Sequence, residues 1–582
     1  MGNISDTIRT TMIQKIINAL TAPIRKHCIF YIAMLALFGI SALFVQYYGS
    51  RKSIILEIFF DAYAVSLIVA LMPKKWQKIA KYILFALFTL IGMIDMVCYK
   101  TTGIAISPNI MTTWLQTNSD EAFEAFSSYI TYVLISPAIL FLLLPLCIWW
   151  FKRIGFTINR HIALFIAGIT IISTVYGIEN KIYIYKTHAL KTDDTMVMVC
   201  DYKEISREYL PHYRLLYSVK EISRFSNMRE SLEKNMETAQ IDSCSFDSPI
   251  IVLLIGESYN RHHSSLYGYD KETTPRQQQM FNNGELYRFN DVISSYNLTF
   301  KSFQNMLSLY NYDKKHNWYD YPLVTTLFRK AGYEVSFFSN QFCLDKRSSL
   351  SEIIDDMFIN NEKLSKHMFD KRNAKTCQYD LGLIDEYKQL CDTASSAPQL
   401  VIFSFIGMHA EFSKRYPPEF AKFDAEDYIR KDLNTKEIQT IAEYDNAILY
   451  NDFVVDSIVH CFKEREAIII HVPDHGELVY DNTTLFGRKL QLEKTVVPPQ
   501  YDIPFTIYCS PSYKEKHNDI CRMIEASTER PFMTDDLAHL LLFLAGIKCE
   551  EYDESRNLID ENFNEERKRL ICGEVDYDIL CN

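Results

Sequence analysis

Several side chains that could bind a metal follow short aliphatic runs in the second half of this 582-residue chain. Glu257, His409 and the pair Asp474–His475 each come directly after or within two residues of such a run. Carboxylates and imidazoles suit Zn²⁺, with a fourth position left for another ligand. Each element alone is a weak signal, because a single acid after a strand is commonly a cap and a single histidine commonly satisfies a loop. Together they predict a zinc site.

A divalent metal at such a site suggests phosphoryl or sulfuryl transfer. This chemistry needs a nucleophile, and two hydroxyl groups are candidates. Ser258 adjoins Glu257, but a residue next to a ligand often points away from the metal. Thr299 lies where a polar loop turns into an apolar-periodic helix. A hydroxyl at a helix N-terminus sits among free N–H groups that favour an alkoxide and a bound phosphate. Simple N-capping is the commoner role for such a threonine, yet Thr299 is the stronger candidate.

The elements that must position these residues are strands alternating with helices. Apolar, β-branched or aromatic runs predict strands at 248–256, 333–340, 399–407, 467–472 and 503–510. Helical patterns fall between them, including 441–462 and 535–547. This alternation predicts an α/β domain over 248–582 with a mostly parallel sheet that is covered on both faces. Ligands bind beyond the carboxyl ends of such strands, where the candidate ligands stand.

The first part of the chain has a different character. Five apolar runs lie at 27–48, 53–72, 82–99, 129–151 and 161–178. Each has about the ~20 residues that a helix needs to cross a membrane. The runs predict a transmembrane domain of five helices over 1–180, rather than a soluble core or a cleaved signal peptide. Glu57, Asp61 and Asp95 are costly in lipid, so we expect them to face neighbouring helices or the interface.

The basic residues near these runs predict an orientation. They gather before the first run, between the second and third, and between the fourth and fifth, which places those loops in the cytoplasm; Arg51 and Lys52 are the contrary signal. An odd number of spans puts everything after residue 180 outside the cytoplasm. Residues 181–247 form a tyrosine-rich connector, typical either of amphipathic helices on the membrane surface or of a plain tether.

Charge and cysteine content add two further constraints. A net charge of −11 argues against a nucleic acid partner. Eleven of the fourteen cysteines follow residue 180, where an oxidising compartment would permit disulfides, but their pairing cannot be read from the sequence.

A series of motifs carries a resemblance to a known family. In order, they are GESYNRHHSSLYGYDKETTP, DVISSYNLT, FFSNQ, IGMHAEFSKRYPPEF, YDNAILYNDFVV and PDHGE. The series resembles the phosphoethanolamine transferases of bacterial envelopes, a family with the alkaline phosphatase/sulfatase fold. The resemblance implies a multi-pass protein of the bacterial inner membrane whose catalytic domain faces the periplasm. It also implies a transfer of phosphoethanolamine from phosphatidylethanolamine to lipid A, a core sugar or another envelope glycan.

The resemblance also implies roles for individual residues. Glu257, Thr299, Asp474 and His475 would bind zinc, and Thr299 would be the nucleophile that carries the phosphoethanolamine. His409 would contact the transferred phosphate or protonate a leaving group. Asn340 and Gln341 would lie near the substrate.

Two departures from the family pattern stand out. Many relatives have a further histidine in a Gly-His after the Asp-His pair, where this chain has Arg488. An arginine cannot bind a metal but can pair with a phosphate, so a second metal site is in doubt. Some relatives also have a cysteine pair beside the nucleophile, where this chain has Ser295 and Asn305.

Two other functions remain open at this point. A glycerol-phosphate transferase like lipoteichoic acid synthase shares the five spans, the outer domain and the threonine nucleophile. A non-catalytic membrane scaffold with the same fold would also fit, and Arg488 is the feature in its favour. Zinc content distinguishes the scaffold, which should purify without a stoichiometric metal ion.

Overall fold

The computed structural model describes most of the chain. The described residues are 2–44, 51–102, 105–107, 110–111, 145–146, 148–150, 152–153, 156–170, 172, 210–222, 225–314, 317–342, 358–391, 397–481, 483–489 and 492–581. They form two compact units, and the chain passes from the first to the second at residues 223–224.

The first unit is helical. Its long helices are α1 (Gly2–Lys26), α2 (Cys28–Phe44), α3 (Arg51–Leu71) and α4 (Lys74–Thr102), and α10 (Pro211–Ile222) joins them. Two of these helices are long and apolar enough to cross a membrane, and a third span results if the bent pair Gln14–Lys26 and Cys28–Leu43 counts as one. The predicted run 129–151 lies largely outside the described residues, and 161–178 is represented by the short apolar helix Arg160–Thr170. The five-span count therefore stays a prediction.

Two acids of the apolar helices, Asp61 and Asp95, have hydrogen-bond partners inside this unit. The Arg214 guanidinium donates from Nε and Nη2 to the carboxylate of Asp95, and Asp95 also accepts the backbone N–H of Ile106 at 2.9 Å. The Tyr213 hydroxyl donates to Asp61 at 2.6 Å. Asp61 and Asp95 thus face neighbouring elements, as we expected of acids in apolar helices. The first turn of α10, which belongs to the connector, supplies their partners.

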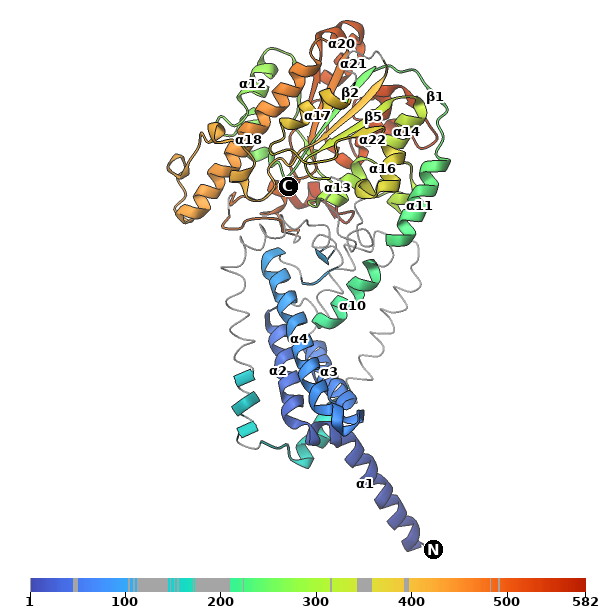
Figure 1. The fold of residues 1–582 in the computed structure, drawn as a ribbon, viewed down its shortest axis with the longest axis vertical. Coiled ribbons are helices and arrows are strands. Elements are labelled where there is room, and N and C mark those ends of the chain that lie inside the picture. The colour runs from blue at the N-terminus through green and yellow to red at the C-terminus, as the bar shows by residue number, and fades with distance from the viewer. Residues whose placement is uncertain are drawn as a thin grey trace. The chain divides into compact units, whose positions relative to one another are not determined.

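The second unit is built on a seven-stranded sheet (Figure 1). Its strand order is β3 (Leu286–Phe289), β9 (Phe505–Cys509), β8 (Ala467–Pro473), β2 (Ile250–Gly256), β7 (Gln399–Ser404), β5 (Glu334–Ser339) and β6 (Lys371–Arg372). β9 runs antiparallel to both of its neighbours, and every other pair is parallel. The five predicted strands are confirmed, and the reversal of β9 makes the sheet mixed.

Helices cover both faces of this sheet (Figure 1). On one face, α12 (Pro275–Asn282), α17 (Gly382–Leu390) and α18 (Thr435–Phe462) share a core with Val252 and Leu254 of β2. On the other face lie α14 (Val324–Ala331) and α22 (Leu537–Ala545). All seven residues of β2 are buried because the strand is covered on both sides, which explains its continuous aliphatic sequence.

The second unit has further helices and short strands. The helices are α11 (Phe225–Thr238), α13 (Thr299–Met306), α16 (Glu362–Met368), α19 (Val497–Tyr501), α20 (Pro511–Lys516), α21 (Asn518–Ala526) and α23 (Tyr577–Cys581). The short strands are β1 (Ser243–Cys244), β4 (Val292–Ile293), β10 (Phe532–Met533), β11 (Ile547–Lys548), β12 (Leu570–Ile571) and β13 (Val575–Asp576). Two 3₁₀ turns, η1 (Arg261–His263) and η2 (Ser265–Tyr267), follow β2.

Candidate functional site

Strand register brings two of the predicted ligands together. β2 and β8 are parallel neighbours in which Gly256 pairs with Pro473, so Glu257 and Asp474 are the next residues on adjacent strands. The backbone N–H of Asp474 donates to the Gly256 carbonyl at 3.0 Å, so the strand register continues to the first residues after the two strands. A Cβ at Gly256 would lie 3.3 Å from Pro473, so glycine suits this close approach.

The three predicted side chains form a compact, buried cluster. Ligand atoms of Glu257, Asp474 and His475 all lie within 4.8 Å of one another. His475 Nε2 is 3.5 Å from Glu257 Oε1 and 3.4 Å from Asp474 Oδ2. None of the three residues is more than 1 % exposed. Sites with two carboxylates and an imidazole at this spacing suit a divalent cation such as Zn²⁺.

The atoms that surround the cluster orient its ligands. His475 Nδ1 is 2.7 Å from the Gly476 carbonyl, so Nδ1 carries the proton and Nε2 keeps its lone pair toward the cluster. Asp474 Oδ1 accepts the backbone N–H groups of Ser258 and His475. Asp474 Oδ2 is buried and accepts no hydrogen bond from the described residues. A bound cation would satisfy this oxygen, so the residues present fit a metal ion.

The electrostatics of the cluster agree with that fit. Burial and the Arg488 guanidinium lower the pKa of His475 to about 3, so the imidazole is neutral and able to bind a metal. Burial, together with the charge of Glu257, raises the pKa of Asp474 well above its usual value. Burial also disfavours the charged form of Glu257, but His475, Arg488 and His409 hold its pKa below the usual range. A further cation is needed beside Glu257 and Asp474 if both of these buried carboxylates are to be charged at the same time.

Thr299 completes the predicted set. It is the first residue of α13, and the residue in the N-cap position is Leu298, so Thr299 is not the cap that the simpler interpretation required. Its Oγ1 lies 3.1 Å from Glu257 Oε2 and 3.3 Å from His475 Nε2. The loop before it is fixed by Asn297, whose side-chain amide donates to the Gln500 side chain at 3.0 Å. The start of α13 and the hydrogen bond of Asn297 therefore place the Thr299 hydroxyl at the cluster.

Ser258 lies closer to the cluster than expected. Its backbone has a φ of 56°, the left-handed region that non-glycine residues seldom adopt. The hydroxyl donates to Glu257 Oε1 at 2.7 Å rather than pointing away. The Tyr444 hydroxyl bridges the Ser258 carbonyl and the Asn260 N–H, at 2.6 and 2.8 Å, and so fixes this turn. Through these contacts, Ser258 helps to hold the predicted metal ligand Glu257 in position.

Arg488 also contacts the cluster directly. Its Nη2 donates to Glu257 Oε1 at 2.9 Å and to Ser258 Oγ at 3.2 Å. Its Nε donates to Glu477 Oε2 at 3.4 Å. The sequence interpretation assigned no role to Glu477, although it is the last residue of the quoted motif PDHGE and is 7 % exposed. The signal available in the sequence was an acid two residues after a predicted metal ligand.

The other predicted substrate residues occupy different positions. Gln341 Nε2 donates to Glu257 Oε2 at 2.9 Å, so Gln341 lies at the cluster. Asn340 is turned inward: its Nδ2 donates to Asp380 at 2.8 Å, and its Oδ1 accepts the Cys377 N–H. His409 is half-buried beyond β7, close enough that its charge would lower the pKa of Glu257. Their roles toward substrate stay predictions.

Comparison with known proteins agrees with this fold and site. The family model described as Sulfatase matches residues 249–547. The phosphoethanolamine transferase EptC of Escherichia coli K12 is 25 % identical over 529 residues, covering 88 % of each chain. The Helicobacter pylori phosphoethanolamine transferase EptA is 28 % identical over 300 residues, covering 50 % of this chain and 52 % of that protein.

Solved structures show the same likeness. The C-terminal periplasmic domain of E. coli EptC has 28 % identity and a TM-score of 0.50, and the match covers 59 % of this chain and 96 % of that domain. The integral membrane protein EptA of Neisseria meningitidis, a lipooligosaccharide phosphoethanolamine transferase, has 15 % identity and a TM-score of 0.58. That match covers 91 % of this chain and 97 % of EptA, so it extends the shared fold to both units.

These matches, with the buried cluster at the carboxyl edge of the sheet, define the class of protein: the chain belongs to the Sulfatase family. Within that class it is a relative of the bacterial phosphoethanolamine transferases, which confirms the resemblance inferred from its motifs.

Proposed function

We propose that this protein transfers phosphoethanolamine from phosphatidylethanolamine to an acceptor of the bacterial envelope, through a covalent intermediate on Thr299. The observation that carries the proposal is the position of Thr299 Oγ1, 3.1 Å from Glu257 and 3.3 Å from His475. Curated relatives that match 88 % and 83 % of the chain are phosphoethanolamine transferases, which supports the choice of group. The acceptor is a lipid A, core sugar or other glycan of the envelope.

The residues of the cluster have distinct tasks in this reaction. Glu257, Asp474, His475 and Thr299 would hold a zinc ion, which when bound would lower the pKa of a hydroxyl ligand and offset charge on phosphoryl oxygens. Glu257 Oε2 and His475 Nε2 orient the Thr299 hydroxyl. The position of Thr299 in the first turn of α13 places free backbone N–H groups beside the transferred phosphate.

Two displacements follow from this arrangement. In the first, the deprotonated Thr299 Oγ1 forms a bond to phosphorus while the bond from phosphorus to the diacylglycerol oxygen breaks, and protonated His409 gives that oxygen a proton. In the second, an oxygen of the acceptor forms a bond to the same phosphorus while the bond from phosphorus to Thr299 Oγ1 breaks, which leaves Thr299 deprotonated again. Where the acceptor group is a hydroxyl, the now neutral His409 takes its proton and is restored. Arg488 supports both steps, because none of the described residues accepts a hydrogen bond from its Nη1 and the side chain is 24 % exposed. Nη1 would bind a phosphoryl oxygen.

The apolar helices give the reaction its location. Helices long enough to cross a membrane precede the second unit, and donor and acceptor are both membrane lipids or membrane-attached glycans. We place the protein in the bacterial inner membrane with the second unit on the periplasmic side. Because the protein is anchored in the membrane that holds its substrates, the site and the substrates meet by diffusion in two dimensions instead of three.

The proposal predicts a mass change on one residue. With phosphatidylethanolamine and no acceptor, the full-length protein in detergent should gain the mass of one phosphoethanolamine, because Thr299 keeps the group until an acceptor takes it. Intact-mass spectrometry should show this adduct in the wild type and in Ser258→Ala, but not in Thr299→Ala. An adduct that persists in Thr299→Ala and vanishes in Ser258→Ala would overturn the assignment of the nucleophile.

A further inference from the structure

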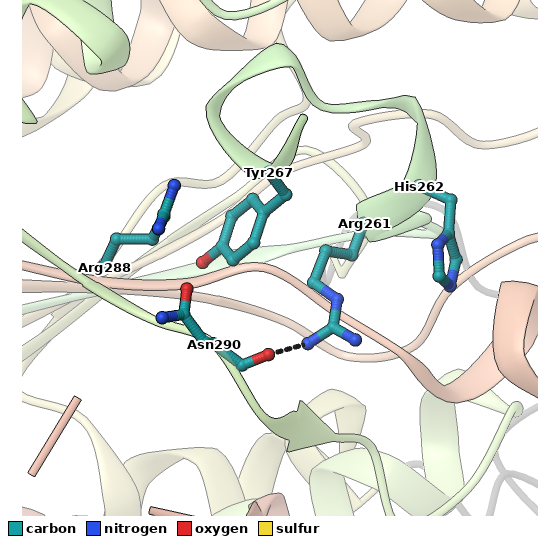
Figure 2. A pocket seen from close by; sticks show the side chains of 5 residues that line it. All are labelled: Arg261, His262, Tyr267, Arg288 and Asn290. Carbon is teal, nitrogen blue, oxygen red and sulfur yellow. Dashed lines mark hydrogen bonds between the residues drawn. The ribbon is translucent and has the colours of Figure 1, made fainter. Parts of the chain in front are cut away.

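A second polar pocket lies beside the candidate site, and it has no part in the reaction described above. Its cavity of about 250 Å³ is lined by Arg261, His262, Tyr267, Arg288 and Asn290. Figure 2 shows the Tyr267 ring between the side chains of Arg288 and Arg261, with Asn290 below it. The guanidinium carbons of Arg288 and Arg261 are 5.7 and 5.8 Å from the centre of that ring. Two cationic groups therefore share one small cavity.

Arg288 has fewer hydrogen-bond partners than Arg261 among the described residues. Its Nη1 donates to the Leu266 carbonyl at 2.7 Å, and its guanidinium stacks 4.8 Å from the centre of the Phe281 ring. Its Nε is buried without a hydrogen-bond partner, and none of the described residues pairs a carboxylate with this side chain. Leaving such a donor buried and unpaired costs free energy, which a ligand oxygen would recover. The Nε–Nη2 edge has the fork geometry that binds phosphate.

The acidic groups near the pocket pair with lining residues other than Arg288. Asp502 accepts from Arg261 Nη2 at 3.2 Å and lies 2.8 Å from His262 Nε2, and Tyr577 donates to its other oxygen. Arg261 also donates to the Asn290 carbonyl, as the dashed line in Figure 2 marks. Glu529 accepts a hydrogen bond from the Asn290 amide. Asp502 therefore pairs with Arg261 and His262, Glu529 pairs with Asn290, and among the described residues neither carboxylate contacts Arg288.

The pocket opens near the same edge of the sheet as the candidate site. η1, which carries Arg261 and His262, begins four residues after Glu257, so the Cα atoms of Glu257 and Arg261 are at most ~14 Å apart. Asn290 directly follows β3, which runs parallel to β2 and ends at the same edge. A molecule that reacts at Thr299 can therefore extend a second group toward the pocket.

The size of the cavity limits what that group can be. A water molecule occupies about 30 Å³, and pockets for drug-sized ligands begin near 300 Å³. A cavity of about 250 Å³ therefore suits a head group rather than a whole lipid or sugar chain. Two arginines, a histidine and an amide are donors typical of an oxyanion site.

We propose that this pocket binds a phosphate group of the acceptor, separate from the phosphate transferred at Thr299, with the Nε–Nη2 edge of Arg288 as its main contact. The identity of the acceptor rests on the proposed function, whereas the binding of phosphate does not. A pocket that holds a second phosphate would align the acceptor and favour acceptors that carry such a group.

Direct binding is tested with inorganic phosphate as the probe. Full-length protein in detergent is titrated calorimetrically on an Arg488→Gln background, in which phosphate binding at the cluster of Glu257, Asp474 and His475 should be weaker. Adding Arg288→Gln should weaken phosphate binding about tenfold or more, because a charge-assisted fork is lost. Lys516→Gln is the matched control, since it removes an exposed positive charge beyond the opposite edge of the sheet. Affinity within twofold of the background in Arg288→Gln would overturn the proposal.

The Arg288→Lys variant tests whether misfolding is the cause of a loss of phosphate binding. The lysine keeps the charge and much of the stacking on Phe281 but lacks the fork. It should bind phosphate more weakly than arginine and unfold at the same temperature. If Arg288→Lys binds phosphate as tightly as the background protein, the fork contact is refuted.

Steady-state kinetics test whether the pocket binds a phosphate of the acceptor or the phosphate transferred from the donor. In the Arg288→Gln variant, the KM for an acceptor glycolipid that carries a phosphate group should rise about tenfold, while the KM for the same acceptor without that group stays unchanged. Formation of the Thr299 adduct from donor alone should also be unchanged. An unaltered KM for the phosphorylated acceptor, despite weaker binding of inorganic phosphate, would refute the acceptor assignment. If no adduct forms in the wild type, the proposed function fails while the titration still tests the pocket.

Discussion

Among single residues, Arg488 distinguishes this chain from the pattern that its sequence resembles. It contacts Glu257, Ser258 and Glu477 and places a permanent positive charge beside two buried carboxylates. The guanidinium has no lone pair for a metal, so its contribution there is charge and hydrogen bonding. Because it is 24 % exposed while its partners are buried, one side of the group faces the space where substrate would lie.

Arg488→Gln should separate substrate binding from metal binding. We expect a rise in the KM for donor or acceptor of about tenfold or more, since a charge-assisted hydrogen bond to phosphate is lost. Zinc should remain near one ion per chain by elemental analysis, because the ligand atoms of Glu257, Asp474 and His475 are untouched. Asp474→Asn is the comparison and should lose the ion. Zinc lost from Arg488→Gln would show that this arginine holds Glu257 in place instead of binding phosphate.

At the scale of elements, the site depends on turns that follow parallel strands. The turn after β7 approaches the turn after β2 closely: a Cβ on Gly407 would lie 2.9 Å from the Glu257 carbonyl oxygen and 3.0 Å from its nitrogen. Gly407 has a φ of +47°, and its N–H donates to Asp380 at 3.0 Å. Asp380 also binds Asn340 at the end of β5, so three strand ends are linked.

Gly407→Ala should displace Glu257. The added methyl group meets backbone, which cannot move aside as a flexible side chain would, and the left-handed φ adds strain of about 1–3 kcal/mol. We expect a lower unfolding temperature and a slower formation of the Thr299 adduct. Gly284→Ala is the control, because Gly284 has a φ of +70° and open space around the added carbon. Equal loss of adduct formation in both variants would mean that strain alone, and not pressure on Glu257, is responsible.

At the scale of the whole molecule, the apolar helices contain a buried ion pair that the connector completes. Asp95 is fully buried and Arg214 is 1 % exposed, although they stand 119 residues apart in the chain. Removal of one partner leaves the other charge buried and unpaired, which costs about 3–5 kcal/mol. Removal of both partners avoids that cost.

A double-mutant cycle tests this pairing. Asp95→Leu and Arg214→Leu should each lower the unfolding temperature of the first unit in detergent, and the double variant should be more stable than either single variant. Tyr213→Phe, which removes only a hydrogen bond to Asp61, should have a smaller effect. Additive losses in the double variant would contradict the pairing.

The sequence by itself determined the local elements and the chemistry that they carry. Short aliphatic runs that end near Glu257, Asp474 and His409 indicate buried strands, because strands covered on both faces have near-continuous β-branched and aliphatic sequences. The ends of those runs were therefore visible as candidate sites, and the motif order predicted the family. Neither β3 nor the short β6 was predicted, because both include partly exposed polar or charged residues and lack the aliphatic signal.

Only the tertiary structure decided how these pieces meet. The pairing of Gly256 with Pro473 places two carboxylates side by side, and no periodicity encodes that register. The reversal of β9, the inward turn of Asn340 toward Asp380 and the contact of Arg488 with Glu257 also depend on neighbours distant in the chain. The physical reason is the same in each case: hydrogen bonds and charges between distant segments depend on packing, whereas the sequence pattern reports only which residues are buried.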